Sequence, residues 1–202
     1  IKGMNSKGTW IMMAQDNRKP HTTVETVKTL SAGDMVELCD AAVETIEQGG
    51  GFGWLTPPPR NVLEDYWKGV MLIPERELII GRIDGVISAS CQIVRPPRNN
   101  EAQRLTCNLT TFFVAPWARG QGLAPLMLDE AEALSRTEGF KVINLDVRAT
   151  QTRAIQRYEA AGYVRFGEHP KYAYVDGEYV TGYYYYKEIL EKSDKPRKGS
   201  DA

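Results

Sequence analysis

The sequence predicts a mixed α/β fold in which helices pack against one β-sheet. Two observations point to this class. Segments whose apolar residues recur at helical spacing alternate along the chain with short strand-like segments. In addition, the apolar runs 77–83 and 86–94 flank Asp84-Gly85, which is a strong β-hairpin signal. The predicted order is strand, two helices, three strands, helix, strand, helix and two strands, which favours a single sheet covered by helices.

Each element can be placed from its local pattern. The expected strands are 23–30, 77–83, 86–94, 105–114, 142–147, 163–167 and 179–189. The expected helices are 34–48, 61–67, 123–138 and 151–161. We expect Ser31 to cap the first helix and Thr150 the last, and Asn61 with Glu64 to form a capping box at the second. Gly162 is expected to end the last helix in the C′ position.

Composition excludes several classes of protein. The chain has 202 residues, 25 Lys and Arg against 26 Asp and Glu, and a net charge of −1, so a whole-surface interaction with nucleic acid is not expected. No apolar stretch approaches the length of a membrane span, and no signal peptide is expected at the start. The three cysteines lack a paired-ligand pattern and fit free thiols in a reducing cytoplasm. With only two histidines, no metal site is expected.

The pattern indicates one domain between two less regular ends. Residues 1–20 show no period and are expected to form a loose arm, in which Ile1–Gly3 ahead of Met4 are compatible with a cloning remnant. Residues 192–202 are polar and are expected to be a disordered tail. The domain itself is expected to span 21–191.

The most informative stretch is 114–124, where a strand runs into a glycine-bearing turn that opens a helix. The first amides of a helix have no internal partner and carry partial positive charge, and Gly120 and Gly122 would let phosphate oxygens approach them. Arg119 adds a charged fork at the same point. This stretch alone also allows an alternative in which the glycines only form the turn, no phosphate binds, and Arg119 is a solvated surface residue. No Walker P-loop string occurs, and Pro125 at the third glycine position argues against a Rossmann turn.

Two motifs together carry a family resemblance. The first is Arg119-x-x-Gly122-x-Ala124, and the second is Gln151-x-x-Ala154-x-x-x-Tyr158-x-x-x-Gly162-Tyr163. They resemble the coenzyme A turn and the following helix of the GNAT superfamily of N-acetyltransferases, and the element order matches that family from about residue 23 to 189. The resemblance implies a mostly antiparallel sheet of six or seven strands, flanked by about four helices. Its central parallel strand pair would open to hold acetyl-CoA, and 21–191 would form a single N-acetyltransferase domain.

The resemblance also implies roles for individual residues. The residues that would bind acetyl-CoA are Phe112, Phe113, Val114, Arg119, Gly120, Gln121, Gly122, Leu123, Ala124, Gln151, Ala154 and Tyr158. Tyr158 would also be catalytic, because a phenol can donate a hydrogen bond or a proton to the departing thiolate. Two positions depart from the family: Gln151 stands where Asn is common, and Pro125 removes one amide from the first turn of the helix.

The general base is not assigned by the sequence. The strand 105–114 carries no carboxylate, so Glu64, Glu101 and Asp146 remain candidates. Asn108 or Thr110 can at most orient a water.

Other side chains bear on the acceptor. The aromatic residues at 54, 66 and 67 fit either a pocket or a core, and the five carboxylates of the first helix fit either an acidic wall or a solvated face. The segment 167–172, with Asp176-Gly177, resembles GNAT members that acetylate small amine toxins, of the tabtoxin-resistance type.

We therefore expect an acetyl-CoA-dependent N-acetyltransferase that moves an acetyl group to a primary amine, on a small molecule, by direct attack. Two alternatives stay open: acetylation of a protein lysine or N-terminus, and a GNAT-fold module that binds acyl-CoA without transfer. Nucleic acid and membranes are not expected as partners, and the sequence is compatible with a homodimer.

Overall fold

A seven-stranded sheet forms the centre of the protein. The computed structural model describes residues 2–4, 10–12, 19–50 and 53–189. In order across the sheet, the strands are β3 (Thr22–Val27), β4 (Arg76–Ile83), β5 (Val86–Val94), β6 (Thr106–Val114), β7 (Val142–Arg148), β9 (Glu178–Glu188) and β8 (Val164–Val175). Neighbouring strands are antiparallel except β6 and β7, which are parallel. The expected mostly antiparallel sheet with one central parallel pair is confirmed.

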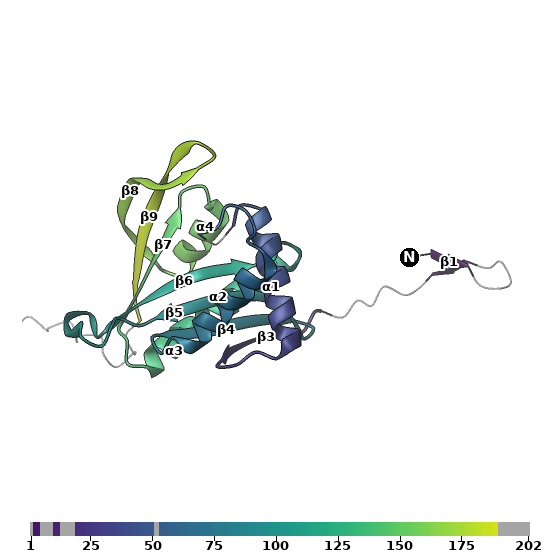
Figure 1. Ribbon diagram of the computed structural model, residues 1–202, viewed down its shortest axis with the longest axis horizontal. Coiled ribbons are helices and arrows are strands. Elements are labelled where there is room, and N and C mark those ends of the chain that lie inside the picture. The colour runs from purple at the N-terminus through teal and green to yellow at the C-terminus, as the bar shows by residue number, and fades with distance from the viewer. Residues whose placement is uncertain (1, 5–9, 13–18, 51–52, 190–202) are drawn as a thin grey trace, which may run out of the picture.

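Within the part of the chain that the structure describes, four α-helices flank this sheet. They are α1 (Ala32–Glu47), α2 (Arg60–Leu72), α3 (Leu123–Thr137) and α4 (Thr152–Ala160), with 3₁₀ turns η1 (Glu101–Gln103) and η2 (Pro116–Ala118). Helices α1 and α2 cover one face of β4–β6, and α3 covers the other face (Figure 1). Gly81 of β4 lets α3 approach closely, because a Cβ there would lie 2.9 Å from both Leu123 Cδ1 and Met127 Sδ.

The core lies between the helices and the sheet. Trp67 of α2, Leu38 of α1 and Ile80 of β4 are fully buried, and Met127 of α3 is buried on the other face. Burial of such side chains from water is the main favourable contribution to folding. It fixes the sheet against both helix layers and so holds the strand ends that carry the site.

Three expected element boundaries are wrong. Helix α2 begins at Arg60 after Pro59 and runs to Leu72, so Asn61 lies inside the helix and caps nothing. Proline has no N–H to leave unpaired at a helix start, which makes this entry favourable. The residue that precedes α4 is Gln151 rather than Thr150, and it makes no side-chain cap. Strand β8 extends to Val175, well beyond the expected segment 163–167, because β9 pairs with both ends of it.

The arm before the domain contains a short ribbon. Strands β1 (Lys2–Met4) and β2 (Trp10–Met12) pair antiparallel within the segment that the sequence indicates as an arm. Three-residue strands leave too little periodicity for a sequence pattern to register. The expected tail 192–202 lies outside the described residues.

The central parallel pair opens after three residue pairs. Thr106–Asn108 pair with Val142–Asn144, and no pairing continues beyond them. Strand β6 stays on β5 while β7 stays on β9, so the two strands diverge towards their carboxyl ends (Figure 1).

A bulge in β6 accompanies the opening. The register shifts between Ser90↔Phe113 and Gln92↔Thr110, and Thr111 has a φ of +53°. A left-handed conformation costs a non-glycine residue about 1–2 kcal/mol. Bulges of this kind re-aim side chains, here at the start of the divergence.

The start of α1 is fixed by charge and capping. The Asp34 N–H donates to Ser31 Oγ at 3.0 Å, and Ser31 N–H donates to Asp34 Oδ2 at 3.2 Å, so the predicted Ser31 cap is confirmed as a capping box. Arg82 Nη1 of β4 donates to Asp34 Oδ1 at 2.7 Å. This guanidinium lowers the pKa of Asp34 below its ordinary value of 3.8.

We expect Asp34→Asn to lower the free energy of unfolding at pH 7 by roughly 0.5–1 kcal/mol, the range for a partly exposed ion pair. Because the folded-state pKa of Asp34 is lowered, its contribution is complete above the unfolded pKa and is lost as the pH falls through the folded pKa. Urea unfolding at pH 7, 5, 4 and 3 measures the difference, which should shrink below about pH 4. The exposed Asp65→Asn serves as the control for net charge. A difference that grows on acidification would contradict this account.

Candidate active site

A large cavity occupies the opening between β6 and β7. Its volume is about 1020 Å³, and it extends from the end of β6 over the turn before α3 to the first turns of α4. It brings together all the predicted cofactor-binding residues except Gln121, namely Phe112, Phe113, Val114, Arg119, Gly120, Gly122, Leu123, Ala124, Gln151, Ala154 and Tyr158. The side-chain Nε2 of Gln121 instead donates to the Trp117 carbonyl at 3.1 Å.

One end of this cavity is built to receive an anion. Gly122 precedes α3 with a φ of +82°, Gly120 has a φ of +83°, and no side chain caps the helix. The first amides of α3 therefore lack a side-chain acceptor and point their partial positive charge at the cavity wall. Pro125, the third residue of the helix, also lines the cavity and contributes no N–H.

Arginine side chains add charge at the same end. Arg119 Nη1 donates to Gln48 Oε1 at 2.8 Å, and its Nε donates to the Val114 carbonyl at 3.3 Å, which hold it across the turn. Arg153 and Arg157 of α4 also line the cavity. Burial, and then the nearby Arg153 guanidinium, lower the pKa of Arg119. Like charges held this close favour an anion between them.

Gln151 has a structural partner. Its Nε2 donates to the Gly49 carbonyl at 2.6 Å, and Arg148 Nη2 donates to the same oxygen at 3.0 Å. These bonds tie the start of α4 and the end of β7 to the chain just after α1. The Gln151 side chain thus joins two walls of the cavity.

Tyr158 of α4 lines the cavity. Its side chain is 5% exposed and packs edge-on against Phe112, with ring centroids 5.9 Å apart. Burial is the main cause that raises the pKa of Tyr158, so the phenol is neutral near pH 7. The side chain is therefore available as a hydrogen-bond donor.

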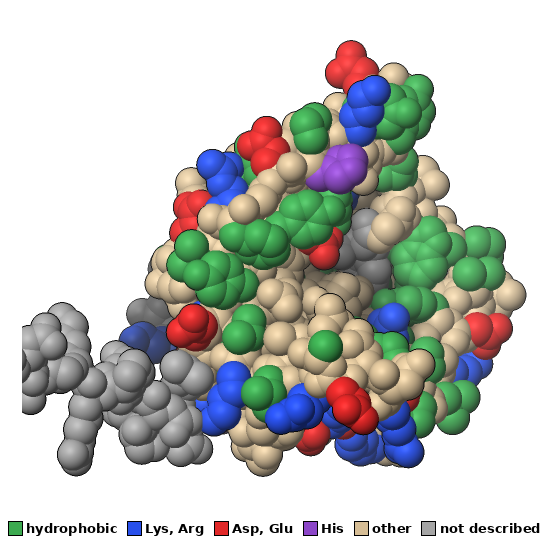
Figure 2. Space-filling model, turned by 90° about the vertical axis from the view of Figure 1, so that its left-hand side faces the viewer, with side chains coloured by type: hydrophobic (Ala, Val, Ile, Leu, Met, Phe, Trp, Pro, Cys, Tyr) green, Lys and Arg blue, Asp and Glu red, His purple; other side chains and the backbone are tan. Residues whose placement is uncertain are grey.

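A second cavity lies beyond Tyr158. It has a volume of about 670 Å³ and shares four lining residues with the first: Phe112, Gln151, Ala154 and Tyr158. Figure 2 shows a hollow below the β8–β9 hairpin, with hydrophobic side chains on both sides. The two cavities thus meet at one shared wall.

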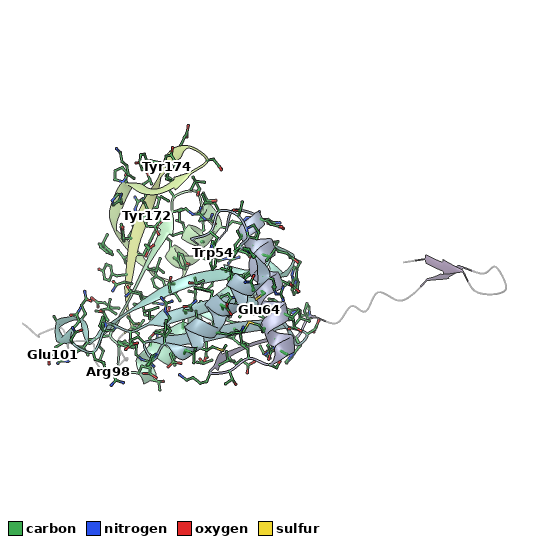
Figure 3. All side chains as sticks on the ribbon, in the orientation of Figure 1. Trp54, Glu64, Arg98, Glu101, Tyr172 and Tyr174 are labelled. Carbon is green, nitrogen blue, oxygen red and sulfur yellow. The ribbon has the colours of Figure 1, made fainter. Side chains whose placement is uncertain are left out.

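The structure separates the candidate carboxylates. Asp146 of β7 lines the second cavity, as does Thr110. Glu64 lies on α2, where it accepts from Arg60 Nε at 3.2 Å, and Glu101 belongs to η1 at the far end of the molecule from Tyr172 and Trp54 (Figure 3). Asp146 is the candidate whose position fits an acceptor site.

The aromatic candidates divide in the same way. Trp54 and Tyr66 line the second cavity, joined by Tyr172 and Tyr174 of β8, whereas Trp67 is fully buried in the core. Among the described residues that line the second cavity, there is no carboxylate from α1. Asp34 and Asp40 pair with arginines instead, at 2.7 Å to Arg82 and 2.5 Å to Arg60.

Some residues of the first cavity had no sequence signal. Thr45 comes from the last turn of α1, and Gln48 and Gly50 follow the helix; only the folded sheet brings them to the turn before α3. Arg153 and Arg157 are basic and near enough in sequence to the glycine turn to be expected to assist a phosphate site, and both line this cavity. Lys141, also basic and near in sequence, precedes β7 at the end remote from α4.

The opened sheet, the glycine turn before α3 and the tyrosine of α4 together define an acetyltransferase fold. The chain belongs to the acetyltransferase (GNAT) family, whose model matches residues 33–163. A relative from Azospirillum brasilense, described as an uncharacterized N-acetyltransferase in the hisH-hisA intergenic region, is 55% identical over 135 residues, which cover 67% of this chain and 80% of the relative.

Solved structures show the same fold at low sequence identity. A GNAT superfamily phosphinothricin acetyltransferase from Sinorhizobium meliloti in complex with acetyl-CoA has a TM-score of 0.70 and 17% identity, with 88% of this chain and 94% of that chain covered. A ribosomal-protein-alanine N-acetyltransferase from Brucella melitensis has a TM-score of 0.69 and 16% identity, with 82% and 99% covered. Within the described residues, no helix is long and apolar enough to cross a membrane.

The glycine before α3 offers a matched test of the anion site. A Cβ on Gly122 or on Gly139, which follows the other end of α3, meets nothing within 4 Å, and both residues have positive φ. Each Gly→Ala change should therefore cost about 1–2 kcal/mol of stability from left-handed strain. Only Gly122→Ala adds a methyl group at the cavity, where it obstructs approach to the α3 amides.

We expect Gly122→Ala to weaken binding of coenzyme A, used as a pyrophosphate probe, by about tenfold, as when one charge-assisted hydrogen bond is lost. Isothermal titration calorimetry measures the dissociation constant, and Gly139→Ala should bind as the wild type does. Equal affinities of the two variants would place the pyrophosphate elsewhere.

Proposed function

We propose that this acetyltransferase moves the acetyl group of acetyl-CoA to the primary amine of a small molecule. The observation that carries the proposal is the shared wall between the two cavities. One cavity presents amides and arginines suited to a pyrophosphate, and the other presents aromatic side chains and a carboxylate. A thioester that reached Phe112 and Tyr158 from the first side would meet an amine arriving from the second.

In this arrangement the residues predicted from the sequence bind the cofactor. The Arg119 side chain and the backbone amides of residues 120–124 bind the pyrophosphate, and Arg153 and Arg157 approach it from α4. The backbone of Phe112–Val114 lies along the open edge of β6, where it can hydrogen-bond the pantetheine arm. Ala154 leaves room for the arm to pass α4.

The chemistry is a direct transfer. The amine nitrogen attacks the thioester carbonyl carbon, a C–N bond forms, and the C–S bond breaks with its electron pair leaving on sulfur. The acceptor passes from an ammonium to an amide and so loses two protons, one of which ends on the thiol of coenzyme A and the other in solvent. Tyr158 donates a hydrogen bond to the sulfur as negative charge develops there.

The cysteines support transfer without an acyl-enzyme. Cys39, Cys91 and Cys107 are buried free thiols. Burial raises the pKa of Cys39 and of Cys107 to about 11, which keeps both protonated and poorly nucleophilic. Free thiols also suit a reducing compartment, so we place the reaction in the cytoplasm.

The size of the second cavity favours a small acceptor. Its 670 Å³ falls within the range of small-molecule pockets, about 300–1,000 Å³. Acetylation of a protein amine and binding of acyl-CoA without transfer are the alternatives that the following experiment separates.

The test is acetyl transfer from acetyl-CoA to a panel of amines and lysine peptides, followed by thiol release. We expect small primary amines to be acetylated, and Tyr158→Phe to lower kcat by about 100-fold with the KM for acetyl-CoA unchanged, as for loss of a proton donor. Tyr186→Phe, on β9 outside both cavities, is the control and should keep full activity.

Three other outcomes would favour a different function or cofactor. Release of thiol with peptides alone would mean a protein acetyltransferase. Thermal stabilisation by acetyl-CoA without turnover on any amine would mean a binding module. If acetyl-CoA neither binds nor stabilises the protein, the cofactor assignment is wrong.

A further inference from the structure

The second cavity contains a hydrogen-bonded pair that the cofactor site does not use. The Tyr172 hydroxyl of β8 donates to Asp146 Oδ2 of β7, across the strand that lies between them. Asp146 itself is exposed to the cavity. Two features of the sheet bring Tyr172 to this position.

The first feature is a bulge in β8. The register passes from His169↔Gly182 to Ala173↔Val180, so residues 170–172 of β8 face a single residue of β9. Extra residues on one strand bend it and re-aim its side chains. Here the bulge turns Tyr172 over β9 towards β7.

The second feature is Gly182 of β9. A Cβ at this position would lie 2.1 Å from Tyr172 Cγ, so the tyrosine ring rests directly on the glycine backbone. Gly182 lies in ordinary strand pairing with both Arg148 and His169. The space taken by Tyr172, and not an unusual backbone conformation, is therefore what excludes a side chain here. The ring is held further by Tyr184, edge-on at 6.2 Å.

The pair holds the Asp146 carboxyl group against the Tyr172 hydroxyl. Burial, and then the hydrogen bond to Asp146, raise the pKa of Tyr172, so its hydroxyl stays neutral and donates. Asp146 also acts on the reaction centre. Burial and then Cys91 are the largest causes that raise the pKa of Tyr158, and the electrostatic effect of Asp146 is the third. Asp146 thus lies within electrostatic reach of the proposed catalytic tyrosine.

The surroundings of Asp146 suit a cation. Trp54, Tyr66 and Tyr172 line the same cavity, and aromatic faces attract ammonium groups. Arg148 is the other charged side chain among the described residues that line it, and it sits two residues from Asp146 on the same strand face. A guanidinium there disfavours a second positive charge on the ligand.

We propose that Asp146, held by Tyr172 resting on Gly182, binds the ammonium group of the acceptor, and that the acceptor is a compact monoamine with one positive charge. The inference rests on the proposed function and deepens it. Asp146 contacts the substrate, whereas Tyr172 and Gly182 are positioning residues. The bound ammonium passes its first proton through the carboxylate to solvent, and the neutral amine then attacks the thioester.

The first test removes the charge. We expect wild-type enzyme to acetylate 2-phenylethylamine in preference to 1,4-diaminobutane. Asp146→Asn should lower kcat/KM for the monoamine by roughly 10- to 100-fold, the range for a lost charge-assisted hydrogen bond, with the KM for acetyl-CoA unchanged. Asp176→Asn, at the exposed tip of the same hairpin, is the matched control and should behave as the wild type does.

Binding gives the same comparison without turnover. Calorimetry should show saturable binding of 2-phenylethylammonium to the coenzyme A-loaded wild type and its loss in Asp146→Asn. No saturable binding to the wild type, equal use of the amine by Asp146→Asn, or preference for the diamine would overturn the inference. If acetyl-CoA still binds and amines are still acetylated in those cases, the proposed function stands and only this inference fails.

The second test is a double-mutant cycle on the positioning residues. Tyr172→Phe keeps the ring on Gly182 and should raise the KM for the amine severalfold while the melting temperature stays unchanged. Gly182→Ala should raise it as well, by displacing the ring. In a Tyr172→Ala background, Gly182→Ala should cause no further loss, because nothing remains to be displaced. Additive losses in the cycle would show that Gly182 acts independently of Tyr172 and would overturn its assigned role.

Discussion

Strands β6 and β7 run parallel through the middle of the sheet, yet they pair only over Thr106–Asn108 and Val142–Asn144. Beyond this point each strand keeps its outer neighbour and loses its inner one. Backbone N–H and C=O groups inside a protein need partners, so the open inner edge of β6 is a place for a ligand with its own donors and acceptors. The turn before α3, the first turn of α4 and the aromatic side chains of the β8–β9 hairpin all gather around this opening.

The same opening explains how two different ligands can meet. On one side lie helix amides and three arginines, which favour phosphate groups. On the other side lie Asp146 and an aromatic lining, which favour an amine. The wall between them consists of Phe112, Gln151, Ala154 and Tyr158, among which Ala154 leaves space and Tyr158 supplies a neutral phenol. Charge separation across this wall orients the two substrates before any bond changes.

Local patterns predicted much of this arrangement and non-local contacts supplied the rest. The Asp84-Gly85 hairpin, the glycine turn at 120–122 and the α4 motif were found because their signals lie within a few residues. The Tyr172–Asp146 pair could not be found in that way, since it spans 26 residues and depends on a bulge in β8. Nor could the bond from Gln151 to the Gly49 carbonyl, which joins residues 102 apart. Asn61 failed as a cap because Pro59 already fixed the start of α2 one residue earlier.

We infer that acetyl-CoA fills the opening between β6 and β7 with its thioester at the shared wall. A crystal structure with bound coenzyme A tests it most directly. We predict the pyrophosphate on the backbone amides of residues 120–124, the pantetheine arm along the backbone of Phe112–Val114, and the sulfur within hydrogen-bond distance of the Tyr158 hydroxyl. Coenzyme A bound on the outer surface, or a sulfur remote from Tyr158, would contradict the claim.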